Sequence, residues 1–431
     1  MIKRIFTAQS GSITGAAILL AGASFVSRLL GVLRDRALSH TFGAGPELDA
    51  YFTAFRIPDL VYNLVIAGAL SAGFIPLFTK LYSENKEQAW KFTNNVFTTL
   101  LTAVVALSAI LIFFAEPLSA LIAPGFSADQ QLLVASLSKI LFWSPVILGI
   151  SAIASGVLQS LKYFLVYALS PIMYNTGIII GALWFSPHWG ITGVAYGVVL
   201  GAILHLLVQV PTLYHSGFSL AARMRWSAPL RKLLRMMIPR TASLLVYQGV
   251  ILALTIMATT LSVGSVAVFN FANNIQFFPI GIVGISFALA AFPTLCSSGA
   301  HGNMTVYIGT LTGTVRKILL LIVPITVLFL LLRAELVRIV LGSGAFDWAA
   351  TVRTADSLAF FAIGLFAQAL LPLLSRGFWA LHDSTTPFVA SLIGGAVTIT
   401  SARALLPIFE NTAPGNGVLA LAASFALGGV I

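Results

Sequence analysis

Charged side chains are scarce in this chain. Of its 431 residues only 9% are Asp, Glu, Lys or Arg, while 58% are hydrophobic and the mean hydropathy is +0.97. This composition excludes a soluble domain and is typical of a polytopic helical membrane protein. The net charge of +11 does not indicate nucleic acid, because basic residues of membrane chains mainly report orientation and contacts with anionic headgroups.

Cysteine and the common catalytic motifs are also scarce. Cys296 is the single cysteine, which excludes an intramolecular disulfide and a cysteine-ligated metal. The six histidines have no spacing that suits a metal site. The sequence has no P-loop, G-x-S-x-G or H-E-x-x-H motif, so we expect a transporter rather than an enzyme, without cofactor or metal. Its driving force would be an ion gradient, the membrane potential or the substrate gradient.

Apolar runs of roughly 20 residues, the length that crosses a bilayer as a helix, recur along the whole chain. They predict an all-α polytopic membrane protein with about twelve transmembrane helices. The approximate spans are 13–38, 46–79, 92–115, 134–158, 164–186, 190–214, 236–260, 264–297, 316–333, 354–379, 385–408 and 415–431.

Basic residues between these spans predict the orientation of the chain. If every predicted helix crosses the membrane, most of the 24 basic residues fall on one side. Cytoplasmic loops carry the excess of Lys and Arg, so we expect the N-terminus and the loop at 214–240 in the cytoplasm. The residues on this side are Lys3, Arg4, Lys80, Lys86, Lys91, Lys162, Arg223, Arg225, Arg231, Lys232, Arg235, Arg240, Arg316, Lys317 and Arg376.

An internal repeat predicts two homologous six-helix lobes. Residues 49–78 align with residues 266–295 without a gap, so that Pro76 matches Pro293. Two parallel lobes of this kind are expected to enclose a central cavity that opens to each side of the membrane in turn. The expected organisation is an N-lobe at 1–215, a basic cytoplasmic linker at 216–235 and a C-lobe at 236–431.

The first predicted span carries a polar face. Its small or polar positions recur with the spacing of one helical face. An arginine at membrane depth costs about 2.5–3.5 kcal/mol on insertion scales, so we expect these arginines to face an aqueous cavity or an acidic partner. The positions are Ser24, Ser27, Arg28, Gly31, Arg34 and Asp35.

The second predicted span carries a polar stripe of its own. Asp49, Thr53, Arg56 and Asn63 follow the same helical spacing. Pro58 lacks a backbone N–H and is expected to kink or break this helix about one turn below Arg56.

Several motifs then carry a family resemblance. They are SRLLGVLRDRALSHTFGAGPELDAYFTAFRIPDL from Ser27, GALSAGFIPLF from Gly68, APGF at 123–126, FPTL at 292–295, RGFWALHDSTTP at 376–387 and GNGVLALAASFA at 415–426. In order and spacing they resemble the MviN/MurJ family of lipid II flippases, which belongs to the multidrug/oligosaccharidyl-lipid/polysaccharide exporter superfamily. The resemblance implies a two-lobed fold, in most members of fourteen helices, in the bacterial cytoplasmic (inner) membrane, so we expect a C-terminus that is shortened here.

The resemblance also implies a cargo and a binding site. The cargo would be the undecaprenyl-diphosphate-linked peptidoglycan precursor, lipid II, with membrane lipids and cell-wall synthesis proteins as further partners. Arginine binds phosphate bidentately and keeps its charge, and Asp35 and Asp49 would neutralise the arginines until substrate displaces them. The implied substrate-binding residues are Arg28, Arg34, Arg56 and Asp49. Secondary candidates are Ser27, Asp35, Thr53, Asn63, Asn270, Asn273 and Asn274.

Departures from the family pattern leave other functions open. Positions that are charged in the family are occupied here by Tyr62, Asn63, Ala67, Asn273, Asn274 and Phe277. One alternative is a flippase for another lipid-linked oligosaccharide. A second is a multidrug antiporter, which would need a buried acid such as Asp49, and a third is a non-transporting membrane scaffold.

Structural roles are the alternative for each candidate residue. Arg34, Asp35 and Arg36 would form an interfacial cluster that reaches the headgroups. Asp49 would cap the N-terminus of its own helix. The asparagines of the second lobe would supply hydrogen bonds between helices.

Overall fold

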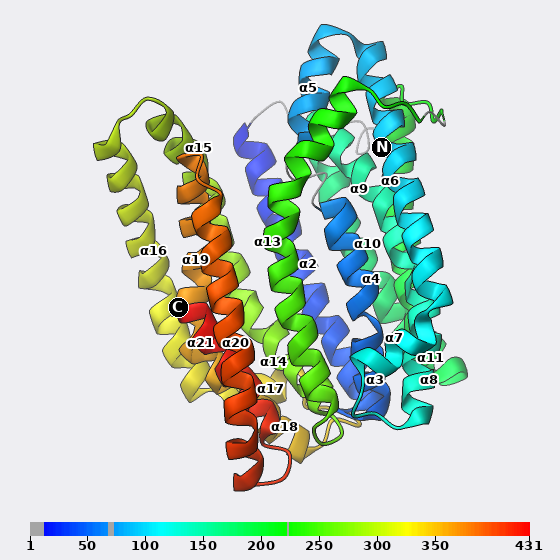
Figure 1. Ribbon diagram of the computed structural model, residues 1–431, viewed down its shortest axis with the longest axis vertical. Coiled ribbons are helices and arrows are strands. Elements are labelled where there is room, and N and C mark those ends of the chain that lie inside the picture. Colours follow the sequence, from blue (N-terminus) through cyan, green and yellow to red (C-terminus); the bar gives the residue numbers. More distant parts are fainter. Residues whose placement is uncertain (1–12, 68–72, 222–223) are drawn as a thin grey trace. The chain divides into compact units, whose positions relative to one another are not determined.

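The structure is a computed structural model that describes residues 13–67, 73–221 and 224–431. Every regular element in these ranges is helical, and Figure 1 shows helices joined by short loops. The predicted all-α fold is therefore confirmed. The predictions for Lys3, Arg4 and Arg223, and for motif residues 68–72, lie outside the described residues.

The N-terminal half of the chain contains the first thirteen described elements. They are α2 (Ile13–Phe42), α3 (Pro46–Ala54), α4 (Arg56–Val61), η1 (Tyr62–Ala67), α5 (Ile75–Glu84), α6 (Lys86–Phe113), α7 (Ala115–Ile122), α8 (Ala128–Leu141), α9 (Trp143–Ser160), α10 (Phe164–Ile180), η3 (Gly181–Phe185), α11 (Ser186–Leu207) and α12 (Val210–His215).

The C-terminal half contains the remaining described elements. They are α13 (Ala228–Thr259), α14 (Ser265–Pro279), η4 (Ile280–Ile285), α15 (Ser286–Ala300), α16 (Met304–Leu331), α17 (Arg333–Val340), α18 (Trp348–Ile363), α19 (Leu365–Ala380), α20 (Thr385–Thr412) and α21 (Gly417–Val430).

These elements form two compact units. Unit 1 comprises Met1–Leu38, Thr53–Ile122 and Ser127–Leu245, and unit 2 comprises Ser39–Phe52, Ala123–Phe126 and Val246–Ile431. The predicted linker at 216–235 is helical from Ala228, because the Ser227 hydroxyl accepts a hydrogen bond from the Leu230 N–H and starts α13.

The element order of the two halves is the same at several places of the predicted internal repeat. Helices α6 and α16 each have 28 residues, and each begins after an asparagine, Asn85 or Asn303, whose side chain accepts a backbone N–H. The loops after α9 and α19 each contain a residue with a left-handed backbone, Lys162 and His382. The π-helical elements η1 and η4 also occupy matching places in the repeat.

The number of membrane crossings differs from the sequence estimate. Six helical segments of the described residues are long and apolar enough to span a membrane, or seven if the bent pair α18 and α19 forms one span. All twelve predicted spans coincide with helices. Several of them are broken into shorter helices, and α2 and α13 carry several charged residues, so the count of twelve stays a prediction.

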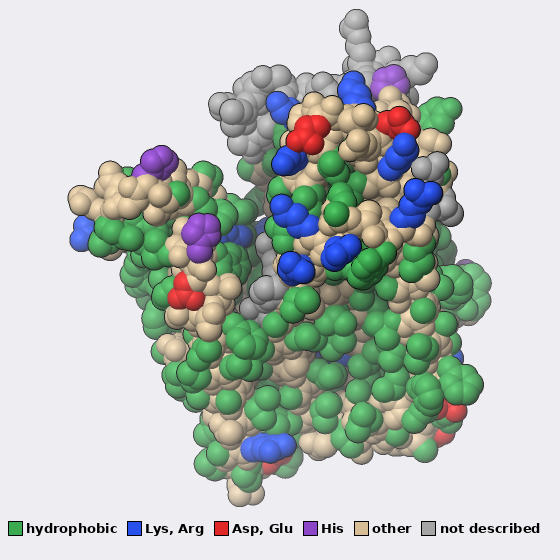
Figure 2. Space-filling model, turned by 45° about the horizontal axis from the view of Figure 1, so that its top comes forward, with side chains coloured by type: hydrophobic (Ala, Val, Ile, Leu, Met, Phe, Trp, Pro, Cys, Tyr) green, Lys and Arg blue, Asp and Glu red, His purple; other side chains and the backbone are tan. Residues whose placement is uncertain are grey.

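A basic surface lies at one end of unit 1. Asn95 on α6 accepts the Arg225 N–H at 2.8 Å and donates to the Arg225 carbonyl at 2.6 Å, and Asn94 similarly binds Ser219 and Ala221. The loop before α13 is thereby held against the beginning of α6. Figure 2 shows Lys and Arg side chains gathered at one end of a surface that is otherwise mostly hydrophobic.

The RGFWALHDSTTP motif builds the turn between α19 and α20. The Asp383 carboxylate accepts the Thr385 and Thr386 N–H groups at 2.9 and 3.0 Å and the Thr386 hydroxyl at 2.6 Å. The hydrogen bonds from Thr386 hold the pKa of the Asp383 carboxyl below its usual range. This motif therefore has a structural role at the start of α20.

Glycines bring α10 and η3 into backbone contact with α11. A Cβ atom on Gly177 would overlap the backbone of Gly201, and one on Gly181 would overlap Gly197. Small residues of this kind allow helices in membranes to approach closely, where dispersion and weak polar contacts replace the hydrophobic effect. The wall that α10 and α11 contribute to unit 1 thus depends on these glycines.

We predict that Gly177→Ala lowers the thermal unfolding midpoint of the purified protein. Overpacking of this kind costs about 1–3 kcal/mol. The matched control is Gly249→Ala in α13, where a Cβ meets open space and better helix propensity contributes up to about 1 kcal/mol. An equal midpoint for both variants would show that the α10–α11 contact is not tight.

Candidate functional site

Pro58 breaks the second predicted span and shapes the site. Helix α3 ends at Ala54 and α4 begins at Arg56, as expected for a proline four residues after Ala54. Pro58 has no N–H to donate to the Ala54 carbonyl. This carbonyl instead accepts a hydrogen bond from the Ser138 hydroxyl at 3.2 Å. A break is present, but it lies at Phe55, directly before Arg56, rather than about one turn from it, so that Asp49 and Thr53 lie on α3 and Arg56 begins α4.

A cavity of about 300 Å³ lies within unit 1, beside the residues that follow this break. Its walls come from α4, η1, α9, α10 and α11. Asp59 contributes its carboxylate, and the remaining polar lining consists of hydroxyl, amide and imidazole groups. The lining residues are Phe55, Pro58, Asp59, Tyr62, Asn63, Ser144, Pro145, Leu148, Pro171, Tyr174 and His205.

Arg34 is held in place by α2 and α10. Its Nε and Nη2 atoms donate to Asp35 Oδ1 at 3.0 and 2.8 Å, and its Nη1 atom donates to Asn175 Oδ1 at 3.3 Å. The Asn175 amide also donates to the Ser27 carbonyl at 3.4 Å. The expected pairing of Arg34 with Asp35 is present, and Asn175 is a positioning residue that the sequence analysis missed.

Asp59 links two of the predicted arginines. Arg56 begins α4, Asp59 follows it by three residues, and both Arg56 and Arg34 act electrostatically on the Asp59 carboxylate. Asp59 was absent from the predicted site. The signal that would have found it is an acid one helical turn after an arginine inside an apolar run, since ionisable residues at that depth seldom lack a partner.

The second repeat carries a neutral version of this pair. In the gapless alignment, Arg56 matches Asn273 and Asp59 matches Gln276. The Gln276 amide donates to Asn273 Oδ1 at 3.0 Å. The fold therefore accepts an uncharged pair at this place in the repeat, and the charges of Arg56 and Asp59 are particular to unit 1.

Polar residues of α9, α10 and α11 form hydrogen bonds in the wall of the cavity. Tyr174 shares a hydrogen bond with Ser144. His205 Nδ1 lies 2.6 Å from the Ser151 hydroxyl, which also accepts the Gln209 amide at 2.7 Å. Such networks are stable in an apolar interior only when their members are satisfied.

Arg28 lies two turns before Arg34 on α2. Its side chain is partly buried, and it makes no hydrogen bond or ion pair with any residue that the structure describes. The arrangement leaves its guanidinium donors available to a ligand.

Asp49 lies in unit 2 and serves another helix. Its Oδ2 and Oδ1 atoms accept the Gly264 and Ala267 N–H groups at 2.6 and 2.8 Å, and the residue is 2% exposed. Gly264 precedes α14 with a left-handed backbone and has no side chain to cap it, so Asp49 supplies the missing acceptor. This capping role involves α14 rather than its own helix, and substrate binding by Asp49 stays a prediction.

The secondary candidates mostly form hydrogen bonds inside their own helices. Asn63 donates to the Asp59 carbonyl at 2.8 Å and lines the cavity. Asn270 donates to the Val266 carbonyl at 2.7 Å, and Asn274 lies on the same helix, α14. Thr53 is fully buried at the end of α3. Of these residues, Asn63 alone lines the unit 1 cavity.

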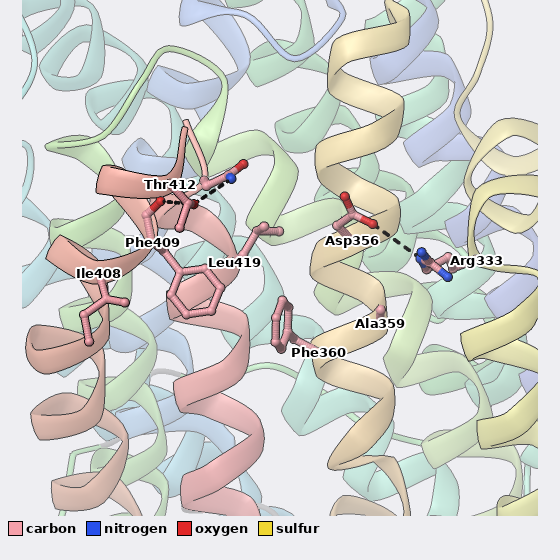
Figure 3. A pocket seen from close by; sticks show the side chains of 9 residues that line it. Arg333, Asp356, Ala359, Phe360, Ile408, Phe409, Thr412 and Leu419 are labelled. Carbon is pink, nitrogen blue, oxygen red and sulfur yellow. Dashed lines mark hydrogen bonds and ion pairs between the residues drawn. The ribbon is translucent and has the colours of Figure 1, made fainter. Parts of the chain in front are cut away.

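A larger cavity of about 490 Å³ lies within unit 2. Figure 3 shows Asp356 of α18 and Arg333 of α17 turned toward each other, with Nε and Oδ1 3.3 Å apart. Phe360, Phe409 and Leu419 line the cavity away from this pair. Both charged side chains are 42% exposed, so the pair contributes at most about 1 kcal/mol, and its charges are already matched.

Comparison with known proteins identifies the family of this chain. The model of the family "Lipid II flippase MurJ" matches residues 38–431. The chain belongs to the lipid II flippase MurJ family. MurJ-family relatives include the probable lipid II flippase MurJ of Rhizobium tropici, 29% identical over 91% of this chain and 75% of the relative, and the lipid II flippase MurJ of Burkholderia cenocepacia, 28% identical over 91% and 78%.

Solved structures agree with this assignment. A lipid II flippase MurJ in an inward closed conformation is 25% identical, with a TM-score of 0.79 over 96% of this chain and 86% of that one. An inward-facing multidrug resistance MATE family transporter is 16% identical, with a TM-score of 0.77 over 94% and 91%. The second likeness concerns the fold alone.

We predict that Asp49→Ala destabilises unit 2. Loss of a cap costs about 0.5–2 kcal/mol, and this one leaves two buried N–H groups without an acceptor. The midpoint of thermal unfolding should fall. Asp129→Ala, which removes an exposed acid from the first turn of α8, is the control and should change it little, and equal behaviour would argue against the cap.

Proposed function

We propose that this MurJ-family protein moves lipid II from the cytoplasmic to the outer leaflet of the bacterial inner membrane by alternating access. The observation that carries the proposal is that the charges of two arginines, Arg34 and Arg56, act on Asp59, whose carboxylate lines the unit 1 cavity. Transport of this kind involves no catalytic step, cofactor or metal. It would supply lipid II to cell-wall synthesis proteins at the outer surface.

The chemistry of a diphosphate suits these arginines. Two phosphates present several anionic oxygens, and the planar guanidinium fork binds them bidentately in a site of low dielectric. In the structure, Asp35 forms an ion pair with Arg34 at 2.8 Å, and Asp59 is the acid one helical turn after Arg56. A diphosphate would take the place of these carboxylates beside the arginines.

Arg28 supports the same proposal from an adjacent position. A guanidinium at membrane depth is costly without a counter-ion, and Arg28 lies two turns along α2 from Arg34. An anionic ligand along this face of α2 would provide the missing charge. Arg28 and Arg34 would thus contact neighbouring parts of one headgroup.

The multidrug antiporter alternative receives less support. It required a buried acid that exchanges protons or cations, and Asp49 was its candidate. Both Asp49 oxygens accept backbone N–H groups of α14. A flippase for another undecaprenyl-diphosphate-linked oligosaccharide would use the same arginine chemistry, and the lipid II assay below distinguishes it.

We predict that the wild-type chain rescues growth of cells depleted of their own lipid II flippase. Arg34→Ala and Arg56→Ala should fail at matched membrane levels. Each loses charge-assisted hydrogen bonds of about 1.5–3 kcal/mol, which corresponds to roughly 10- to 150-fold weaker lipid II binding. Lys139→Ala, which removes an exposed lysine bound to Glu116, is the control and should rescue.

A double variant separates folding from function in this test. Arg56→Asn with Asp59→Gln copies the neutral pair that the second repeat already carries at Asn273 and Gln276. We expect it to insert and fold normally but not to rescue. Rescue by this variant, or failure of the wild-type chain despite correct insertion, would contradict the proposal.

The proposed orientation places the N-terminus in the cytoplasm, and cysteine labelling tests it. In a Cys296→Ala background, Asp129→Cys should react with a membrane-impermeant maleimide added to intact cells. Lys162→Cys should react only after the membrane is permeabilised, because basic loops stay in the cytoplasm. The reverse pattern would invert the topology.

A further inference from the structure

Asp59 is the carboxylate of the unit 1 cavity, and its surroundings fall into two groups. Arg56 precedes Asp59 by one helical turn on α4, and Arg34 lies on α2. Burial disfavours the ionised carboxylate, whereas the positive charges of Arg56 and Arg34 favour it. Tyr62 of η1 and Tyr174 of α10 are partly buried and line the same cavity. The two arginines are therefore the groups that stabilise the ionised carboxylate.

The other elements around Asp59 bring few further titratable groups. Helix α10 also carries Tyr167, which interacts with Tyr62. Helix α11 brings His205, held by Ser151 at 2.6 Å, and α9 brings Ser144. Helices α6 and α8, which also pack against α4, add no titratable residue to the cavity lining.

We infer that Asp59 is a proton-binding site linked to the substrate: it takes up a proton when a diphosphate engages Arg34 and Arg56, and releases the proton when the arginines return. This inference rests on the proposed function. The carboxylate gains one proton from the acid form of the buffer in the surrounding solution and becomes a neutral carboxylic acid, and the buffer is left as its conjugate base.

Electrostatics gives the reason for this linkage. When a diphosphate engages the two arginines, the Asp59 carboxylate loses their stabilising charge. It then remains in a cavity of low dielectric beside the negative phosphates. Burial and the nearby like charge both favour the protonated form. By reciprocity, protonation of Asp59 frees the arginines and strengthens diphosphate binding. Affinity should then fall as pH rises, because the bound state holds one more proton than the free state.

The second repeat indicates that this charge is not required for folding. Gln276 and Asn273 form a neutral hydrogen bond at the matching positions of α14. A carboxylate in unit 1 therefore adds a titratable group to a framework that folds without one. The polar side chains of Asn63 and Ser144 line the same cavity.

The test measures lipid II binding to the full chain in lipid nanodiscs across the neutral pH range. Lipid II is a suitable probe because both of its phosphates are esterified and keep a constant charge there. Calorimetry in two buffers of different ionisation enthalpy reports proton uptake directly. For the wild type we expect proton uptake on binding and an affinity that falls by up to about tenfold per pH unit.

Three variants identify the titrating group. Asp59→Asn should bind lipid II without proton uptake and with an affinity independent of pH, while Asp59→Glu should retain both effects. His205→Gln, in the same cavity, should also retain them. Asp129→Asn, on the surface of α8, is the matched control for removal of an acid.

The outcomes separate the inference from the proposed function. Lipid II binding that weakens in Arg34→Ala and Arg56→Ala, without proton uptake by the wild type, would overturn the inference and leave the flippase proposal standing. Proton uptake that persists in Asp59→Asn or vanishes in His205→Gln would also overturn it. A folded wild-type chain that does not bind lipid II would overturn both.

Discussion

Every charge that this chain places at membrane depth needs a counter-charge or water, because hydrocarbon supplies neither. That constraint accounts for Arg34 with Asp35 and Asn175, and for Asp59 beside Arg56. It also accounts for the buried Asp49, whose charge is stabilised by the N–H groups that open α14. Because a buried arginine needs a negative partner, the places where arginines pair with acids in the structure are also places where an anionic ligand can bind.

The two halves of the chain repeat one set of elements but use them differently. The half that begins with α2 has two charged residues, Arg56 and Asp59, one helical turn apart, whereas the half that begins with α13 has Asn273 and Gln276 there. The charged residues at this place in the repeat are therefore particular to unit 1, where we propose that the diphosphate binds. Unit 2 keeps its ion pair, Arg333 with Asp356, at a more exposed place.

Asp59 shows that a site predicted from arginines and two other acids, Asp35 and Asp49, can still lack one of its charged residues. Arginines attract attention because they bind phosphate, yet an arginine that must release its ligand also needs an alternative partner. In unit 1 that partner is a carboxylate within one helical turn of Arg56. The exchange between carboxylate and phosphate gives the site a way to respond to both substrate and protons.

The helical membrane fold, the internal repeat, a break caused by Pro58 and the candidate role of Arg34 and Arg56 could all be predicted from the sequence. These follow from composition, from period and from a missing N–H, all of which are local properties. Three contacts became known from the structure alone. Asp49 caps α14, and Asn175 accepts a hydrogen bond from Arg34. Asp59 lines a cavity together with Tyr174 and His205. Those contacts join residues far apart in the chain, and helical spacing within one segment carries no information about which other segment will pack against it.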